Sequence, residues 1–167
     1  MTTKNQDIPI YSIGTAARIL GVSVQTLRLY ESEGLIITTK SDGNQRIYSE
    51  SDIERLRCIR KAINEDKISI GGMKQIHGMI PCWDIIKCSS EERTVCPAFK
   101  NHIGGCWTYE HEHSACSERD CRLCEVYKLS TNCRHIKEQI TKISMLPVEQ
   151  LMKQSPVNDE ATEEIVS

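Results

Sequence analysis

The chain has 167 residues and a formal net charge of −2 at pH 7. This length suits one compact domain with a smaller module, or two small modules joined by a linker. The single Phe, two Trp and five Tyr exclude a large core rich in aromatic side chains. Residues 1–80 carry 11 Lys and Arg against 9 Asp and Glu, whereas residues 81–133 carry 6 against 8. Residues 1–80 are thus better suited to bind a polyanion. Their excess of positive charge is small, so a prediction of nucleic-acid binding must come from the residue pattern.

The beginning of the sequence lacks the apolar run of a signal peptide, and no later stretch has the length of a membrane span. We therefore expect a cytoplasmic protein of bacterial type with no membrane partner. Residues 1–9 are expected to be a flexible N-terminus, and the first structural unit is expected to begin at residue 10.

Residues 12–33 predict two short helices joined by a tight turn. Ser12 is placed to cap the first helix and Gly21 to end it. Ser23 is placed to cap the second helix, in which Val24 and Leu27 look inward. Such a pair is typical of a helix-turn-helix, whose second helix can enter a major groove. The apolar residues that recur at helical spacing in the first helix are Ile13, Ala16, Ala17, Ile19 and Leu20.

Residues 35–48 predict a hairpin-like wing, with strands at 35–38 and 46–48 and a turn at 42–44. Ser49 or Ser51 then caps a helix in which Cys58 is interpreted as a small buried hydrophobe. A fourth helix, residues 69–80, is expected to end before Pro81. The apolar stripe of the third helix is Ile53, Leu56, Ile59 and Ile63.

Three ordered motifs, "TLRLYESEGLI", "GNQRIYSESDIERL" and "ISIGGMKQI", resemble the DNA-binding domain of the MerR family of bacterial transcriptional regulators. The nearest resemblance is to its heat-shock-repressor-like and glutamine-regulator-like branch. The resemblance implies a mainly α fold with a winged helix-turn-helix and a small β wing over residues 10–80. It also implies a double-stranded DNA operator, a homodimer, and RNA polymerase as a partner at the promoter.

The resemblance further implies which side chains meet DNA. Arg offers fixed donors to guanine or phosphate, Gln can pair with adenine, and hydroxyl groups reach phosphates. Tyr30 and Tyr48 also have an alternative interpretation as packing residues. Lys40, with Thr38, departs from the residues common among relatives, so wing contacts there are expected to differ. The expected DNA-binding residues are Arg18, Ser23, Gln25, Thr26, Arg28, Tyr30, Lys40, Arg46 and Tyr48.

Dimers of this family usually form through a long helix after the DNA-binding domain, but Pro81 and Cys82 interrupt the chain there. Residues 134–153 form a predicted helical segment that is a candidate for dimerisation, with packing on its own module as the alternative. Residues 154–167 are acidic, with little apolar pattern, and are expected to be disordered.

Residues 81–133 predict a small, irregular cysteine-rich module. In a reducing compartment such a density of thiols favours a metal or an iron–sulfur cluster over disulfides. The module resembles the two-CW modules attached to bacterial signalling proteins, a resemblance that implies no ligand. The expected ligands are Cys82, Cys88, Cys96, Cys106, Cys116, Cys121, Cys124 and Cys133.

The favoured ligand is an iron–sulfur cluster, because only one CxxC pair occurs and the last four cysteines follow the plant-type ferredoxin order. Structural zinc is the alternative, followed by a thiol switch or a soft-metal sensor. Trp83 and Trp107 are predicted either to shield the cluster or to form the small core of the module. His111 and His113 are weaker ligand candidates. The eight cysteines could form two ligand groups, one from residues 82–106 and one from residues 116–133. An arrangement in which the two groups interleave along the chain is the other option.

No nucleotide-binding loop, nucleophile elbow or credible carboxylate pair is present, so an enzyme is not expected. The sequence therefore predicts a DNA-binding transcriptional regulator with a redox- or metal-sensing module. The alternatives are a regulator whose zinc module is purely structural and a thiol or soft-metal sensor.

Overall fold

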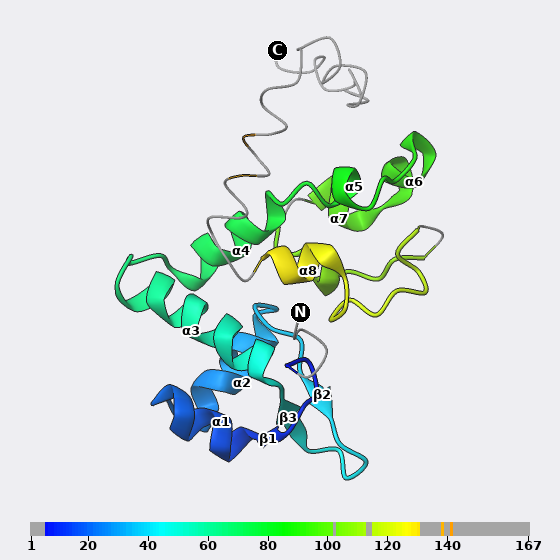
Figure 1. The fold of residues 1–167 in the computed structure, drawn as a ribbon. Coiled ribbons are helices and arrows are strands. Elements are labelled where there is room, and N and C mark those ends of the chain that lie inside the picture. The colour runs from blue at the N-terminus through cyan, green and yellow to red at the C-terminus, as the bar shows by residue number, and fades with distance from the viewer. Residues whose placement is uncertain (1–5, 102, 113–114, 131–137, 139–140, 142–167) are drawn as a thin grey trace, which may run out of the picture.

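The computed structural model describes residues 6–101, 103–112, 115–130, 138 and 141. The helix-turn-helix and a small sheet lie at one end and the short helices α5–α7 at the other, with α8 between them (Figure 1). The predicted segments 134–153 and 154–167 fall outside the described residues, except for residues 138 and 141. The helices are α1 (Ile13–Leu20), α2 (Val24–Ser32), α3 (Glu50–Asn64), α4 (Ile70–Gly78), α5 (Cys82–Ile85), α6 (Ser90–Val95), α7 (Pro97–Asn101), the 3₁₀ turn η1 (Cys106–Thr108) and α8 (Glu125–Leu129).

Serine side chains begin the helices of the DNA-binding unit, as the sequence predicts. Ser12 and Ser23 accept hydrogen bonds from backbone N–H groups of α1 and α2. Ser49, not Ser51, caps α3, and it forms a reciprocal capping box with Asp52. Gly21 ends α1 in the left-handed conformation at φ 63°. The predicted helix-turn-helix is confirmed.

The wing is a three-stranded antiparallel sheet of order β1-β3-β2, formed by β1 (Tyr11–Ser12), β2 (Thr39–Lys40) and β3 (Arg46–Tyr48). The predicted strand at 46–48 is confirmed, and so is the turn, where Asn44 adopts φ 58°. The strand predicted at 35–38 is wrong. Leu35 and Ile36 are consecutive buried residues, and the Leu35 N–H bonds back to the end of α2, so this segment is a core-filling loop.

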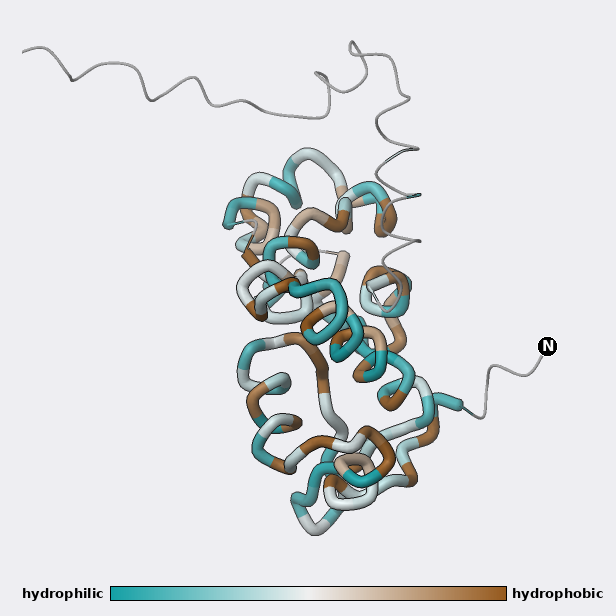
Figure 2. The backbone as a smooth tube through the Cα atoms, turned by 90° about the vertical axis from the view of Figure 1, so that its left-hand side faces the viewer, coloured by the Kyte–Doolittle hydropathy of each residue, from teal (hydrophilic) through white to brown (hydrophobic). Residues whose placement is uncertain are grey.

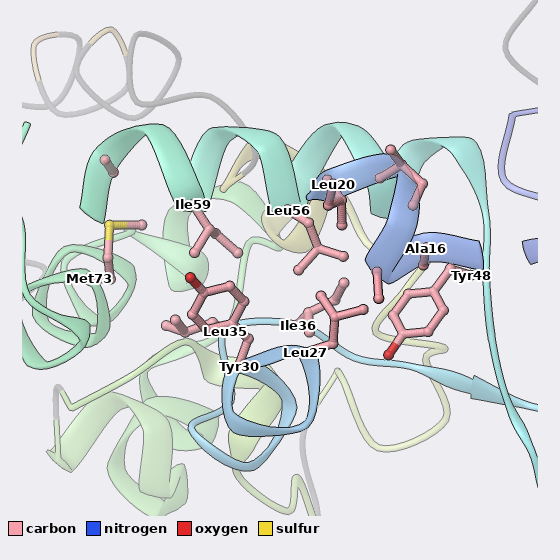
Figure 3. Packing of buried hydrophobic residues seen from close by; sticks show 13 residues of the cluster. Ala16, Leu20, Leu27, Tyr30, Leu35, Ile36, Tyr48, Leu56, Ile59 and Met73 are labelled. Carbon is pink, nitrogen blue, oxygen red and sulfur yellow. The ribbon is translucent and has the colours of Figure 1, made fainter. Parts of the chain in front are cut away.

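One hydrophobic core joins α1, α2, α3 and α4 to the loop after α2 (Figure 3). The stripe on α3 faces this core, with Ile53, Leu56 and Ile59 buried. Cys58 lies on the opposite side of α3 and is exposed, so its interpretation as a buried residue is wrong. The buried members are Ala16, Ala17, Leu20, Leu27, Tyr30, Leu35, Ile36, Tyr48, Ile53, Leu56, Ile59, Ala62 and Met73.

The cysteine-rich segment has a much smaller core. Only Ile80 and Val126 form its buried cluster among the described residues, and Trp107 packs against them half-buried. Apolar stretches recur at intervals along the described part of the chain (Figure 2). None of the described helices has the length and apolar character that a membrane crossing requires. A core this small favours an additional cross-link for the segment.

A buried histidine lies where α4 meets the cysteine-rich segment. His77 of α4 is 3 % exposed, packs against the Trp107 ring at 5.1 Å between ring centroids, and neither ring nitrogen has a hydrogen-bond partner among the described residues. Burial, together with the smaller effect of the nearby Arg55 guanidinium, lowers the pKa of His77 from 6.5 to about 4. The folded protein therefore keeps this imidazole neutral.

We expect acid to destabilise the fold through His77. Between pH 6.5 and about 4 the unfolded chain binds a proton at His77 that the folded chain excludes, so stability present above pH 6.5 is lost as the pH falls. The loss approaches about 1.4 kcal/mol per pH unit, roughly 3 kcal/mol in all. Urea unfolding at pH 7 and pH 5 measures this loss. His77→Leu should show a smaller loss than wild type, and an equal loss in both proteins would contradict the assignment.

Candidate functional site

The exposed side of α2, which begins at the Ser23 cap, carries Gln25, Arg28 and Leu29. The Ser23 hydroxyl accepts from the Thr26 N–H at 3.0 Å and lies 2.9 Å from the Thr26 hydroxyl. Leu27 faces the core, which leaves Gln25 and Arg28 exposed on the other side of the helix. The structure thus places Gln25 and Arg28 on one accessible helix surface, as a recognition helix requires.

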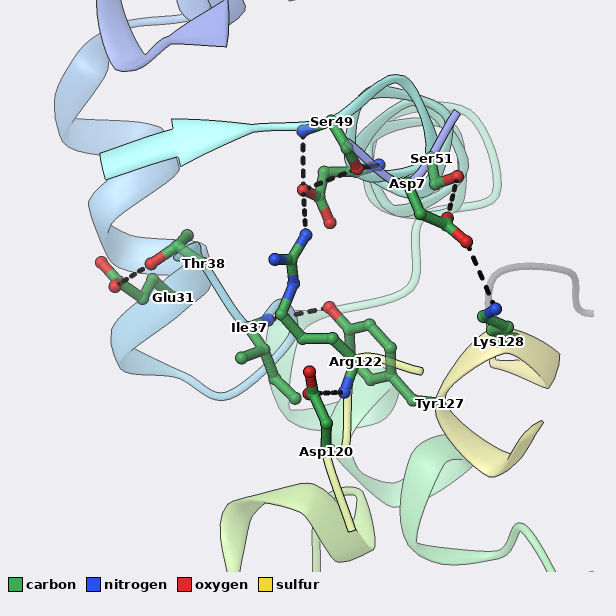
Figure 4. Close-up of polar contacts among 11 residues, drawn as sticks. Asp7, Glu31, Ile37, Thr38, Ser49, Ser51, Asp120, Arg122, Tyr127 and Lys128 are labelled. Atoms are coloured by element: carbon green, nitrogen blue, oxygen red, sulfur yellow. Dashed lines mark hydrogen bonds and ion pairs between the residues drawn. The ribbon is translucent and has the colours of Figure 1, made fainter. Parts of the chain in front are cut away.

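Two more predicted contacts are exposed cations outside α2. Arg18 is exposed near the end of α1, and Lys40 is exposed in β2. Arg46, opposite Lys40 in the wing, donates to the Glu31 carboxylate at the end of α2. Glu31 also accepts from the Thr38 hydroxyl, as Figure 4 shows. Arg46 therefore joins the wing to α2, a positional role that the sequence did not reveal.

Tyr30 and Tyr48 do not belong to this surface. Tyr30 is 5 % exposed and Tyr48 fully buried, and both are members of the main core. Burial raises the pKa of Tyr48 to about 12. Because neither ring reaches the outside, we correct both residues from DNA contacts to packing residues. Their motif positions reflect the core beneath the recognition helix.

Seven cysteines gather around two adjoining cavities in the second half of the chain. Each of the seven is half-buried. Cys106, Cys116 and His111 line both cavities, so the described cysteines follow the predicted division along the chain except that the two groups share Cys106 and Cys116. Cys133 lies outside the described residues. The first cavity adds Cys82, Cys88 and Cys96, and the second adds Cys121 and Cys124.

The thiols are held at the ends of short elements. Cys82 begins α5, Cys96 follows α6, and Cys106 begins η1. Cys124 occupies the N-cap of α8. Turns and helix ends from four separate elements therefore converge, which explains why the spacing in the sequence is irregular.

Burial makes these thiols reluctant to ionise. It raises the pKa of Cys88 and Cys121 and raises that of Cys116 to about 12. The Cys106 thiol donates a hydrogen bond to Cys82, which lowers the pKa of Cys82 and raises that of Cys106. A buried set of soft donors suits a thiophilic metal or cluster, whose positive charge would replace the thiol protons.

The spacing of the donors limits what they can hold. In the described part of the chain, no group of three or more His, Cys, Asp or Glu side chains is close enough to hold one metal ion. Cys82 and Cys106 form a hydrogen-bonded pair, and Cys96 Sγ lies 3.8 Å from His111 Nδ1. Pairs suit a cluster with more than one metal atom better than they suit a single tetrahedral zinc.

The cysteine-rich segment docks on the loop that follows the recognition helix. The Trp107 indole N–H donates to the Gly34 carbonyl at 2.8 Å. The Ile37 N–H donates to the Tyr127 hydroxyl oxygen at 2.8 Å, as Figure 4 shows. Gly34 has φ 70°, and a Cβ there would lie 2.5 Å from the Thr108 side chain. We call Gly34, Ile37, Trp107 and Tyr127 the docking contact.

Charged residues of α3 complete this interface. The Arg55 guanidinium is buried, donates to the Tyr127 carbonyl and the Ser130 hydroxyl, and lies 3.5 Å from the Tyr127 ring centroid. Arg122 pairs with Asp52 at 3.0 Å. Sequence reasoning missed both arginines, because "ERLR" and "CRLC" look like ordinary solvated charges.

The N-terminal residues also reach this interface. The Ser51 N–H donates to the Gln6 carbonyl at 3.1 Å, and the Ser51 hydroxyl donates to Asp7. Lys128 of α8 pairs with Asp7 at 3.3 Å, as Figure 4 shows. Residues 6 and 7 therefore link the beginning of α3 to α8.

Comparison with known proteins agrees with the fold of the N-terminal part. The family profile described as MerR HTH family regulatory protein matches residues 11–77. The chain is 38 % identical over 71 residues to the heat shock protein HspR of Streptomyces coelicolor, covering 42 % of this chain and 47 % of that protein. It is 42 % identical over 65 residues to the transcriptional regulator ZntR homolog of Haemophilus influenzae, covering 38 % and 47 %.

A third relative, the transcriptional regulator GlnR of Bacillus anthracis, is 26 % identical over 76 residues, covering 46 % of this chain and 58 % of that protein. The chain thus spans about half the length of these curated relatives. No solved structure matches the chain. Fold and similarity together make residues 11–77 a helix-turn-helix DNA-binding domain. This domain belongs to the MerR family, and the matched profile ends before the cysteine-rich segment.

We expect Arg28→Ala to weaken DNA binding about 5- to 150-fold, because one good base contact from an exposed arginine is worth about 1–3 kcal/mol. The measurement is a titration with duplexes that the wild-type protein selects from a randomised pool. Lys87→Ala is the matched control, since Lys87 is an exposed cation in the cysteine-rich segment that pairs with Asp84. Unchanged affinity in Arg28→Ala would remove this residue from the interface.

Proposed function

We propose that the chain is a transcriptional regulator that binds a double-stranded operator as a homodimer and senses redox state or metal through its cysteine-rich segment. The exposed side chains of Arg18, Gln25, Arg28 and Lys40 support the DNA-binding half of this proposal. The docking contact supports the sensing half, because it joins residues beside the thiols to the end of the recognition helix.

The proposed ligand is an iron–sulfur cluster. The donor set fits, since half-buried thiols from several elements face narrow spaces lined by Trp83, Phe99 and Ile86. The candidate ligands are the seven described cysteines of the cluster, together with Cys133 from outside the described residues. When bound, such a group supplies a site that gains or loses one electron. Structural zinc and a thiol switch are the alternatives, and the paired spacing of the donors favours the cluster over zinc.

The residues of the chain give this sensor a route to DNA. Cys106 precedes Trp107, whose indole holds the Gly34 carbonyl at the end of α2. Cys124 lies three residues before Tyr127, whose hydroxyl accepts the Ile37 N–H at the start of the wing. A shift of either cysteine on cluster loading would move the end of the loop to which it is connected, and so move α2 and the wing together against α3. The affinity for a two-fold operator would change with it.

Anaerobic purification tests the ligand directly. We expect a brown protein that contains iron and acid-labile sulfide in stoichiometric amounts and that loses visible absorbance on exposure to air. The measurements are iron and sulfide analysis and an absorption spectrum. A colourless protein that retains tightly bound zinc under the same conditions would refute the cluster and leave the structural-zinc alternative.

We expect Trp107→Phe to uncouple cluster state from DNA binding, because Phe fills most of the space but cannot donate to Gly34. The ratio of operator affinities with and without the cluster should move toward one. Tyr109→Phe is the matched control, since it also removes one hydrogen bond, from Tyr109 to the Ile103 carbonyl, and Tyr109 lines neither of the two thiol-lined cavities. An unchanged ratio in Trp107→Phe would show that the signal takes another route.

A further inference from the structure

His111 lies among the thiols, although its neighbours Glu110 and Glu112 are exposed. It is half-buried and lines the first cavity with Cys82, Cys96 and Cys106. His113, the other histidine of "EHEH", lies outside the described residues. The sequence "EHEH" alone suggests a solvated histidine, so the position of His111 among the thiols is known only from the fold.

The hydrogen bonds of His111 determine which ring nitrogen is available. Its Nε2 lies 2.7 Å from the Cys106 carbonyl oxygen. A carbonyl oxygen can only accept, so Nε2 carries the hydrogen and, in the neutral ring, Nδ1 carries the lone pair. Nδ1 lies 3.8 Å from Cys96 Sγ. A ring nitrogen that faces the donors while the other donates to a backbone carbonyl is the usual arrangement of a ligating histidine.

Two donor pairs then face the same cavity. One is Cys82 with Cys106, whose thiols are hydrogen-bonded, and the other is Cys96 with His111. Two protein donors on one tetrahedral metal lie roughly 3.6 Å apart, given metal–sulfur and metal–nitrogen bonds of about 2.3 and 2.1 Å. The separation of 3.8 Å between Cys96 Sγ and His111 Nδ1 is close to this value. The Cys96–His111 pair therefore has the spacing to hold one metal atom, and Cys82 and Cys106 line the same cavity close enough to shift the pKa of one another.

We propose that this cavity holds a [2Fe–2S] cluster with one iron bound by Cys82 and Cys106 and the other by Cys96 and His111. The assignment rests on the function proposed above and specifies its site. It differs from the ferredoxin-like order of residues 116–133 in the sequence. A [2Fe–2S] cluster needs two donors on each iron, and replacement of cysteine by histidine on one iron is chemically established. The space between the side chains is about 20 Å³, so the two pairs must move apart to admit the cluster.

A neutral imidazole in place of one thiolate has a measurable consequence. It removes one negative charge from the ligand set, which favours the reduced cluster and raises the reduction potential. His111→Cys should therefore keep a cluster but shift its potential downward. The same variant removes the nitrogen ligand, so the two effects should appear together.

Pulsed electron paramagnetic resonance of the reduced, anaerobically purified full chain tests the nitrogen ligand. Wild-type protein grown with ¹⁵N-histidine should show a ¹⁵N coupling to the cluster, and His111→Cys should lose that coupling while retaining iron and sulfide. His77→Leu is the histidine control and should keep the coupling. A cluster without nitrogen coupling, or with coupling that persists in His111→Cys, overturns this assignment and leaves the proposed function standing.

Serine variants test the sulfur ligands. Cys82→Ser, Cys96→Ser and Cys106→Ser should each lose most of the bound iron, whereas Cys121→Ser, which lines only the second cavity, should retain it. Iron loss in Cys121→Ser with retention in Cys96→Ser would overturn the assignment in favour of the CxxC side. Absence of iron and sulfide in anaerobic wild-type protein would refute the proposed function and this site together.

Discussion

The buried guanidinium of Arg55 is the interaction on which the arrangement of the two parts depends. It is 2 % exposed, and burial lowers its pKa, so the charge is held at a cost in desolvation. That cost is offset only where the Tyr127 carbonyl, the Ser130 hydroxyl and the Tyr127 ring surround it. All three belong to the cysteine-rich segment. Undocking would leave an α3 arginine without these partners, so the docked arrangement is strongly favoured.

The cysteine-rich segment in turn depends on the docking, because its own core is small. Ile80 and Val126 form its buried cluster in the described part of the chain, and its helices α5–α8 have four to six residues each. Helices this short are not stable alone. The segment therefore takes its shape from α3 and the loop after α2 on one side and, in our proposal, from a cluster on the other. A change in either support is transmitted to the other, as coupled binding requires.

Local signals in the sequence predict the DNA-binding domain well, because caps and turns act within a few residues. Ser12, Ser23 and Gly21 are examples. The strand at 35–38 is misassigned because Leu35 and Ile36 are both buried in the core, where alternation along a strand would bury only one of them. The exposure of Cys58 follows from its position opposite the apolar stripe of α3, which helical periodicity could have indicated. The partners of Arg55 are more than 70 residues away in sequence, so no local pattern predicts its burial. Cysteine spacing predicted a cluster of thiols but not its donor pairs, which depend on how α5, α6 and η1 converge.

In our proposal, the position of the docking contact allows one small segment to influence the DNA-binding domain. Gly34 follows α2 and Ile37 precedes β2, so the contact holds both ends of the loop between recognition helix and wing. Arg46 and Glu31 already join the wing to α2 directly, which limits independent motion of the two. A displacement at Trp107 or Tyr127 must therefore move α2 and the wing as one unit against α3. In a dimer on a two-fold operator, such a displacement would alter the spacing of the two recognition helices. Recognition of the two half-sites is most sensitive to this spacing.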